Sequence, residues 1–175
     1  MKVIGIKVEN KERGEFVLES LQAAVAAQRV TLADIALVTK DEKGDVHIHQ
    51  TKDITTGKGA RRGVLVGALV GLAAPPLLGA AVVGGGIGAL WGKFRDRGID
   101  DDMMKNIGGM VADGQAVVFA LGDDASIDAL NARVNEVGGN DVETFTIDNK
   151  NEAIVREAAN DIPEPTGYLV KAPIA

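Results

Sequence analysis

Thirty consecutive residues near the middle of the chain carry no charged side chain. They read GVLVGALVGLAAPPLLGAAVVGGGIGALWG, from Gly63 to Gly92, in a chain of which 25% is charged. Such a run cannot lie exposed on a monomer, because apolar surface of this extent marks a site where a protein meets a membrane or another protein. Three structures come into question: a membrane segment, a phosphate-binding glycine loop, and a surface that packs against copies of the chain.

A phosphate-binding loop is excluded by its own spacing rule. The loop needs a glycine, four residues, then Gly-Lys followed by Ser or Thr. If Gly92 and Lys93 formed the Gly-Lys pair, the first glycine would have to stand where Ile87 is, and Phe94 occupies the Ser/Thr position. A looser dinucleotide-binding pattern inside the run lacks a partner strand that ends in an acidic residue. We therefore expect no nucleotide cofactor.

Small residues recur at every fourth position on both sides of a Pro-Pro pair. The two series are Gly59, Gly63, Gly67, Gly71 and Ala80, Gly84, Gly88, Gly92. Residues four apart lie nearly on one face of a helix, where small side chains let another backbone approach closely. Proline cannot continue a helix comfortably, so Pro75 and Pro76 predict the turn of a helical hairpin. The pattern predicts a glycine zipper that self-associates through Gly63, Gly67, Gly71, Gly84, Gly88 and Gly92.

Packing has to stabilise this hairpin, since each interior glycine costs a helix about 1 kcal/mol relative to alanine. A bilayer could supply that stabilisation, but the arms of ~11 and ~15 residues are shorter than the ~20 that span it. Basic and aromatic residues flank the run as they do at a cytoplasmic membrane interface. These expected anchors are Arg61, Arg62, Trp91, Lys93 and Arg95. Two interpretations stay open: a shallow membrane anchor, and a soluble hairpin buried between subunits of a homo-oligomer.

The rest of the chain alternates strand and helix patterns. Apolar or alternating runs predict strands, and stripes at helical spacing predict helices. The expected elements are strands at Val3–Val8, Ile35–Thr39, Val46–Gln50, Ala116–Leu121 and Val142–Ile147, with helices at Arg13–Gln28 and from Asp123 or Asp124 to Val137. The order β-α-β-β, insert, β-α-β predicts an α+β protein, specifically a ferredoxin-like split βαβ sandwich interrupted by the glycine-zipper hairpin.

Three parts follow from this division. Residues 1–51 and 111–150 form the discontinuous ferredoxin-like domain, and residues 52–110 form the inserted hairpin plus a short helix within IDDDMMKNIGGMV. Residues 151–175 form a C-terminal helix and an extended tail, whose YLV motif could add a strand to a sheet edge.

The layout resembles a bacterial family known as domain of unknown function 1269, whose members are described as membrane proteins. The resemblance rests on the stretches GARRGVLVGALVG and GGGIGAL and on the basic exit WGKFRDRG. It implies the same split domain with a glycine-rich hairpin. It implies no activity, cofactor or catalytic residue that could be transferred to this chain.

Composition excludes several other classes of function. The formal net charge of -6 argues against a nucleic-acid partner, because phosphate backbones are bound through Lys and Arg. The charge is uneven: residues 57–99 hold six basic residues and one aspartate, a net of +5 that leaves -11 for the remainder. The absence of cysteine excludes disulfides, thiolate nucleophiles and cysteine-bound metals. The acidic N-terminal stretch does not resemble a signal peptide, so we expect a cytoplasmic protein, at the inner face of the membrane if the hairpin is an anchor.

No catalytic constellation is recognisable. His47 and His49 are the only histidines, and on a strand they project to one face. A polar, exposed strand face explains them better than a metal site, since no carboxylate motif accompanies them. We expect a non-enzymatic structural or scaffolding protein that binds itself or membrane lipid. The alternative is a small-molecule-binding regulatory module of the same fold.

Overall fold

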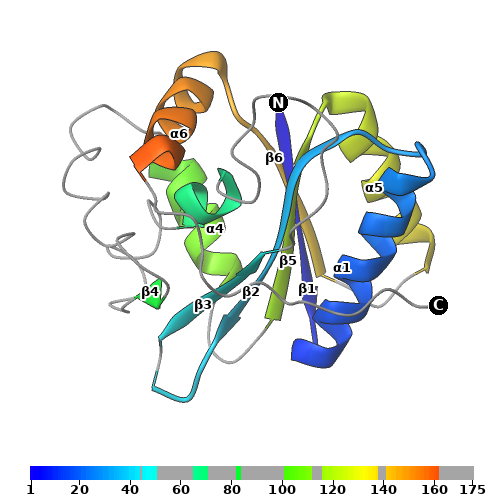
Figure 1. Cartoon of the computed structure of the whole chain (residues 1–175), viewed down its shortest axis with the longest axis horizontal. Coiled ribbons are helices and arrows are strands. Elements are labelled where there is room, and N and C mark those ends of the chain that lie inside the picture. Colours follow the sequence, from blue (N-terminus) through cyan, green and yellow to red (C-terminus); the bar gives the residue numbers. More distant parts are fainter. Residues whose placement is uncertain are drawn as a thin grey trace.

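A computed structural model describes residues 1–43, 45–50, 65–70, 82–83, 101–111, 116–137 and 141–161 (Figure 1). In chain order its elements are β1 (Lys2–Val8), α1 (Lys11–Ala26), β2 (Leu32–Lys40), β3 (Val46–Gln50), β4 (Val82–Val83), α4 (Asp101–Met110), β5 (Ala116–Gly122), α5 (Asp124–Val137), β6 (Asp141–Thr146) and α6 (Asn149–Asp161). Residues 65–70 are also helical. The mixture of helices and strands around one sheet confirms the predicted α+β class.

The strands form one sheet in the order β4-β3-β2-β5-β1-β6. β1 lies between β5 and β6 and is antiparallel to both. β2 is antiparallel to both β5 and β3, so five strands make an antiparallel sheet. The short β4 adds to the outer edge of β3 and runs parallel to it. β5 is central, and all seven of its residues are buried.

Both faces of the sheet are apolar, and helices cover both. Figure 1 shows α1 and α5 on one side of the sheet and α4 and α6 on the other. The α1/α5 side packs around side chains that alternate along the strands, among them Ile4, Ile6, Val118 and Ala120. The second side, which we call the α4/α6 face, includes Val3, Val117, Phe119 and Leu121, and residues 65–70 belong to this core.

The ends of α1 differ from the prediction by two residues each, for local reasons. The helix begins at Lys11 because the side chain of Asn10 caps it, accepting a hydrogen bond from the backbone N–H of Arg13 at 2.9 Å. It ends at Ala26 because Gln28 adopts a left-handed conformation, with φ at 55°. The N–H groups of Gln28 and Arg29 then bond back to the last turn, which closes the helix.

The predicted helical hairpin is wrong at two positions. Val82 and Val83 form the strand β4, paired with Val46 and His47 of β3, although the second arm was expected to be helical here. Valine favours extended backbone, and the neighbouring glycines lower the stability of any helix in this stretch. Gly63, Gly71, Gly84, Gly88 and Gly92, the Pro75–Pro76 turn and the five flanking anchors lie outside the described residues.

A glycine in β1 allows helix α4 to approach the sheet closely. Gly5 points toward the α4/α6 face, where a Cβ atom would overlap the end of the Met110 side chain and lie 3.1 Å from Cε1 of Phe119. Met110 and Phe119 are both fully buried, so neither has free space to move into. The absence of a side chain at Gly5 is therefore what seats the last turn of α4 on the centre of the sheet.

We predict that Gly5→Val lowers the free energy of unfolding by about 1–3 kcal/mol, through overpacking against Met110. Combining it with Met110→Ala should cost less than the sum of the two single substitutions, by about 1 kcal/mol or more. Urea denaturation measures all three variants. The control is Gly109→Ala, at a site in α4 where a Cβ meets open space and which should gain up to about 1 kcal/mol. Additive costs for Gly5 and Met110 would contradict the proposed contact.

Candidate functional site

Six residues from the first arm of the apolar run, residues 65–70, are part of the protein's own core. Residues 65–70 form a helical segment in which all six positions are buried. Its apolar side chains are 0–7% exposed, and they pack in the cluster that contains Ile107, Met110, Val155 and Phe119. Gly67, the one predicted zipper residue within the described part of the chain, lies in the middle of this segment. Its lack of a side chain fits the close packing of the segment.

A carboxylate holds this segment to the sheet. Oδ2 of Asp34 accepts a hydrogen bond from the backbone N–H of Val66 at 2.8 Å, and Oδ1 accepts one from its neighbour Ile35 at 2.9 Å. The carboxylate thereby supplies an acceptor for a backbone donor that is buried in the core. Asp34 is only 3% exposed. Its carboxylate therefore interacts with residues 65–70 and not with solvent.

Asp34 lies beside a β-bulge in β2 and is directed toward the α4/α6 face. The register of β2 against β5 shifts between Leu32 and Asp34, so that Ala33 and Asp34 together oppose a single residue of β5. Leu32 and Ile35 both remain in the core of the α1/α5 side, which regular alternation would not allow for residues three apart. Asp34 alternates with Ile35 and lies on the same face as Ala36, toward Val66, and the inserted residue keeps Leu32 on the α1/α5 side.

Burial raises the pKa of Asp34 from its ordinary value of 3.8 to about 7. The N–H groups of Val66, Ile35 and Leu65 oppose this rise, because they stabilise the ionised carboxylate. The sequence prediction missed Asp34 because the strand was expected to begin at Ile35. The sequence did contain a signal, because LADIALV is an apolar strand interrupted by one acidic residue. An aspartate is seldom buried without a specific partner, so this residue could have been recognised as one that binds another part of the chain.

The two histidines lie side by side at the edge of the sheet, as the spacing predicted. Their rings stack with centroids 6.4 Å apart. Nε2 of His47 is 2.9 Å from Oδ2 of Asp41, which fits a tautomer that donates to the carboxylate, and Nε2 of His49 is 3.1 Å from Oγ1 of Thr39. Both side chains are partly buried, so this face is less exposed than expected. Burial lowers the pKa of His49, with smaller contributions from Lys11 and His47, so its neutral form is favoured.

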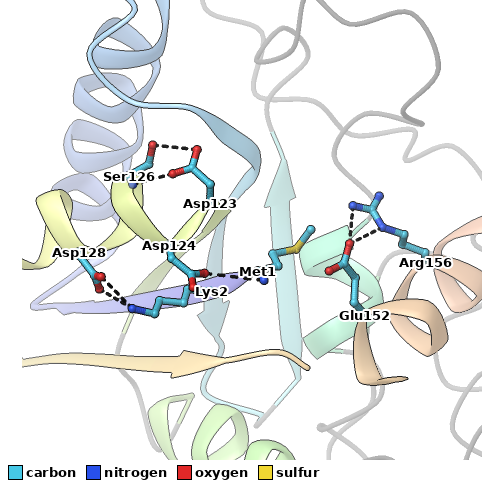
Figure 2. A network of polar contacts seen from close by, with 8 residues as sticks. All are labelled: Met1, Lys2, Asp123, Asp124, Ser126, Asp128, Glu152 and Arg156. Carbon is cyan, nitrogen blue, oxygen red and sulfur yellow. Dashed lines mark hydrogen bonds and ion pairs between the residues drawn. The ribbon is translucent and has the colours of Figure 1, made fainter. Parts of the chain in front are cut away.

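A second polar cluster joins the N-terminus of the chain to α5 (Figure 2). Nζ of Lys2 contacts both oxygens of Asp128, at 2.7 and 2.8 Å, and the amino group of Met1 lies 3.8 Å from Asp124. Both aspartates are largely exposed. Asp123 accepts a hydrogen bond from the N–H of Ser126 at 2.8 Å and so caps α5, as its position in the sequence predicted. These contacts tie α5 to β1 and show no arrangement for chemistry.

Within the described ranges, no three His, Asp or Glu side chains gather as a metal site would require. Those ranges also contain no helix that is both long and apolar enough to cross a bilayer. The part of the chain that the structure describes thus offers two buried features for a function, Asp34 and the segment it holds.

The chain belongs to the family described as "Protein of unknown function (DUF1269)", whose model matches residues 60–160. This confirms the suspected family. The match covers the apolar run, α4, β5, α5, β6 and nearly all of α6, and leaves out the first 59 residues with β1, α1, β2 and β3. No match was found among curated proteins or among solved structures.

We predict that Asp34 makes stability depend on pH. Because the folded protein binds the Asp34 proton more tightly than the unfolded chain, this residue's contribution to the free energy of unfolding falls as pH rises from about 4 to about 7, by roughly 4 kcal/mol in all, and is constant above. Urea denaturation of wild type and Asp34→Asn across pH 4–8 isolates the effect. The stability of the variant relative to wild type should rise through this window. A constant difference would show that Asp34 titrates normally.

Proposed function

We propose that this member of the family is a non-enzymatic, self-associating scaffolding protein of the cytoplasm, in which the glycine-rich run packs between copies of the chain. The burial of residues 65–70 is the observation that carries the proposal. It shows that the chain treats the first arm of the run as protein core. Small residues at every fourth position then supply the close backbone contact between copies.

A shallow membrane anchor is the less favoured version of this proposal. Insertion into lipid is driven by moving apolar side chains out of water. Leu65, Val66, Leu69 and Val70 are already out of water, so their transfer from core to bilayer exchanges one apolar environment for another. Insertion of this arm would also separate the N–H of Val66 from Asp34.

Two attachments to the sheet support a preformed contact surface. Residues 65–70 are fixed to the α4/α6 face, and Val82–Val83 pair with the edge of β3. A surface whose ends are already ordered loses less conformational entropy on association than a mobile one. The apolar run is therefore better suited to binding a second copy than its glycine content alone would suggest.

We also propose that the sheet domain is ferredoxin-like. The arrangement of four strands supports it: β1 lies between β5 and β6, β2 lies beside β5, and each neighbouring pair is antiparallel. α1 connects β1 to β2 and α5 connects β5 to β6, and both helices cover the same side (Figure 1). Under this proposal, the apolar run and α4 are an insert that covers the face the split βαβ units leave bare.

The experiment is a measurement of native mass by light scattering, in detergent-free buffer at micromolar concentration, after membranes have been removed by ultracentrifugation. We expect a uniform soluble particle whose mass is a multiple of that of the monomer. Gly84→Leu with Gly88→Leu, both in the predicted seam, should reduce that mass. Gly67 is avoided because it lies in the core. Gly109→Leu adds an equally large side chain at an open site of α4 and should leave the mass unchanged.

Three results would count against the proposal. A stable monomer would contradict self-association. An assembly whose mass is unaffected by the double substitution would contradict the role of the glycine-rich run as the contact between copies. Recovery of the protein only in a detergent-extractable pellet would replace soluble assembly with the membrane anchor.

A further inference from the structure

Asp34 is one of two polar side chains that are buried in the part of the chain that the structure describes, the other being Asn151. Its hydrogen bonds are to its own strand and to residues 65–70, the segment that opens the apolar run. The carboxylate therefore links β2 to this segment. Its position gives it a specific influence over whether this segment stays docked.

Among the residues that the structure describes, the elements packed against Asp34 direct no charged side chain toward it. β5 and residues 65–70 contain no ionisable residue. On α4 and α6, the side chains that pack on the sheet are apolar, and the ionisable residues of these helices are Asp101, Asp102, Lys105, Lys150, Glu152, Arg156, Glu157 and Asp161. Glu152 pairs with Arg156 at 2.9 Å along α6. The histidines of β3 lie on the other side of the strand from Val46 and Ile48, which join this core.

The shift in the pKa of Asp34 accordingly has burial as its largest cause, opposed by the three backbone N–H groups. If residues 65–70 left the core, water would reach the carboxylate, and its pKa would return toward the ordinary value. The docked state thus binds the proton more tightly than the undocked state. By linkage, docking is strongest when Asp34 is protonated and weakens as pH rises from about 4 to about 7.

We propose that residues 65–70 are a releasable segment of the core, and that loss of the proton from Asp34 loosens their docking while the sheet stays folded. The inference deepens the proposed function and rests on it in one respect: the released segment would add Gly67 to the seam between copies. Residues 65–70 take part in none of the strand pairs of the described sheet, so their release would leave those pairs intact.

The absence of native cysteine allows a direct test. Single cysteines are introduced by Ala68→Cys in the segment and by Ala120→Cys in β5, both at positions that are 0% exposed. Ala153→Cys, on the exposed side of α6, serves as the reference. Labelling with iodoacetamide is followed from pH 5 to pH 8, and each rate is divided by that of the reference variant at the same pH. This ratio removes the intrinsic pH dependence of the thiol.

We expect the relative rate of Ala68→Cys to rise between pH 5 and pH 8 by at least tenfold, and to exceed that of Ala120→Cys. In the Asp34→Asn background the rise should disappear. Asp34→Ser, which keeps a hydroxyl acceptor and cannot titrate in this range, repeats the test if the asparagine variant folds poorly. Equal rates for Ala68→Cys and Ala120→Cys at every pH would overturn the proposal, because the segment would then open only on global unfolding. A rise that persists without Asp34 would overturn it as well.

Light scattering on the unlabelled wild type over the same pH range separates this inference from the proposed function. If labelling follows Asp34 but the protein is monomeric throughout, the releasable segment stands and the scaffolding function falls. If the protein assembles through the glycine run but labelling of Ala68→Cys does not depend on Asp34, the scaffolding function stands and the releasable segment falls.

Discussion

A sheet with apolar side chains on both faces must be covered on both, and most of the molecule follows from that requirement. α1 and α5 cover one face because each connects two strands that are separated by one other strand of the sheet, and crosses that face to do so. The opposite face is covered by α4, α6 and residues 65–70. The central strand β5 shows the result, with every residue buried. Part of a sequence that looks like a membrane segment is thus needed for the fold itself.

Residues 65–70 cover part of the second face, and their buried backbone N–H groups need hydrogen-bond acceptors. Asp34 is the acceptor for the N–H of Val66. A buried carboxylate is an expensive acceptor, as its raised pKa shows. A neutral serine or asparagine at the same position would satisfy a donor at lower desolvation cost. The bulge beside Asp34 interrupts the regular pairing of β2 with β5. β-Bulges are over-represented at sheet edges and next to functional sites.

Local patterns in the sequence were sufficient for most of the sheet and helices. The strand at Val46–Gln50 was predicted with the bounds that the structure has, since its alternation is regular. The ends of α1 were displaced because Asn10 and Gln28 act through backbone geometry that periodicity does not report. Asp34 was missed because the strand was expected to begin one residue later, at Ile35, whereas β2 begins at Leu32. The sequence pattern could not decide whether residues 65–70 lie in the protein core or in a membrane, because a run of six apolar residues is compatible with both. The sheet face that covers them is built from strands that are distant from them in the sequence.

The two borders of the described sheet are protected in different ways. At one border the chain returns as β4 and occupies the hydrogen-bonding edge beside Val46 and His47. At the other, β6 carries acidic residues, and Lys7 on the neighbouring strand draws near Asp141 and Glu143, at 3.4 and 3.7 Å. Exposed strand edges invite fibrillar aggregation, and occupation or charge discourages it. Growth by endless strand addition at either border of the described sheet is therefore disfavoured.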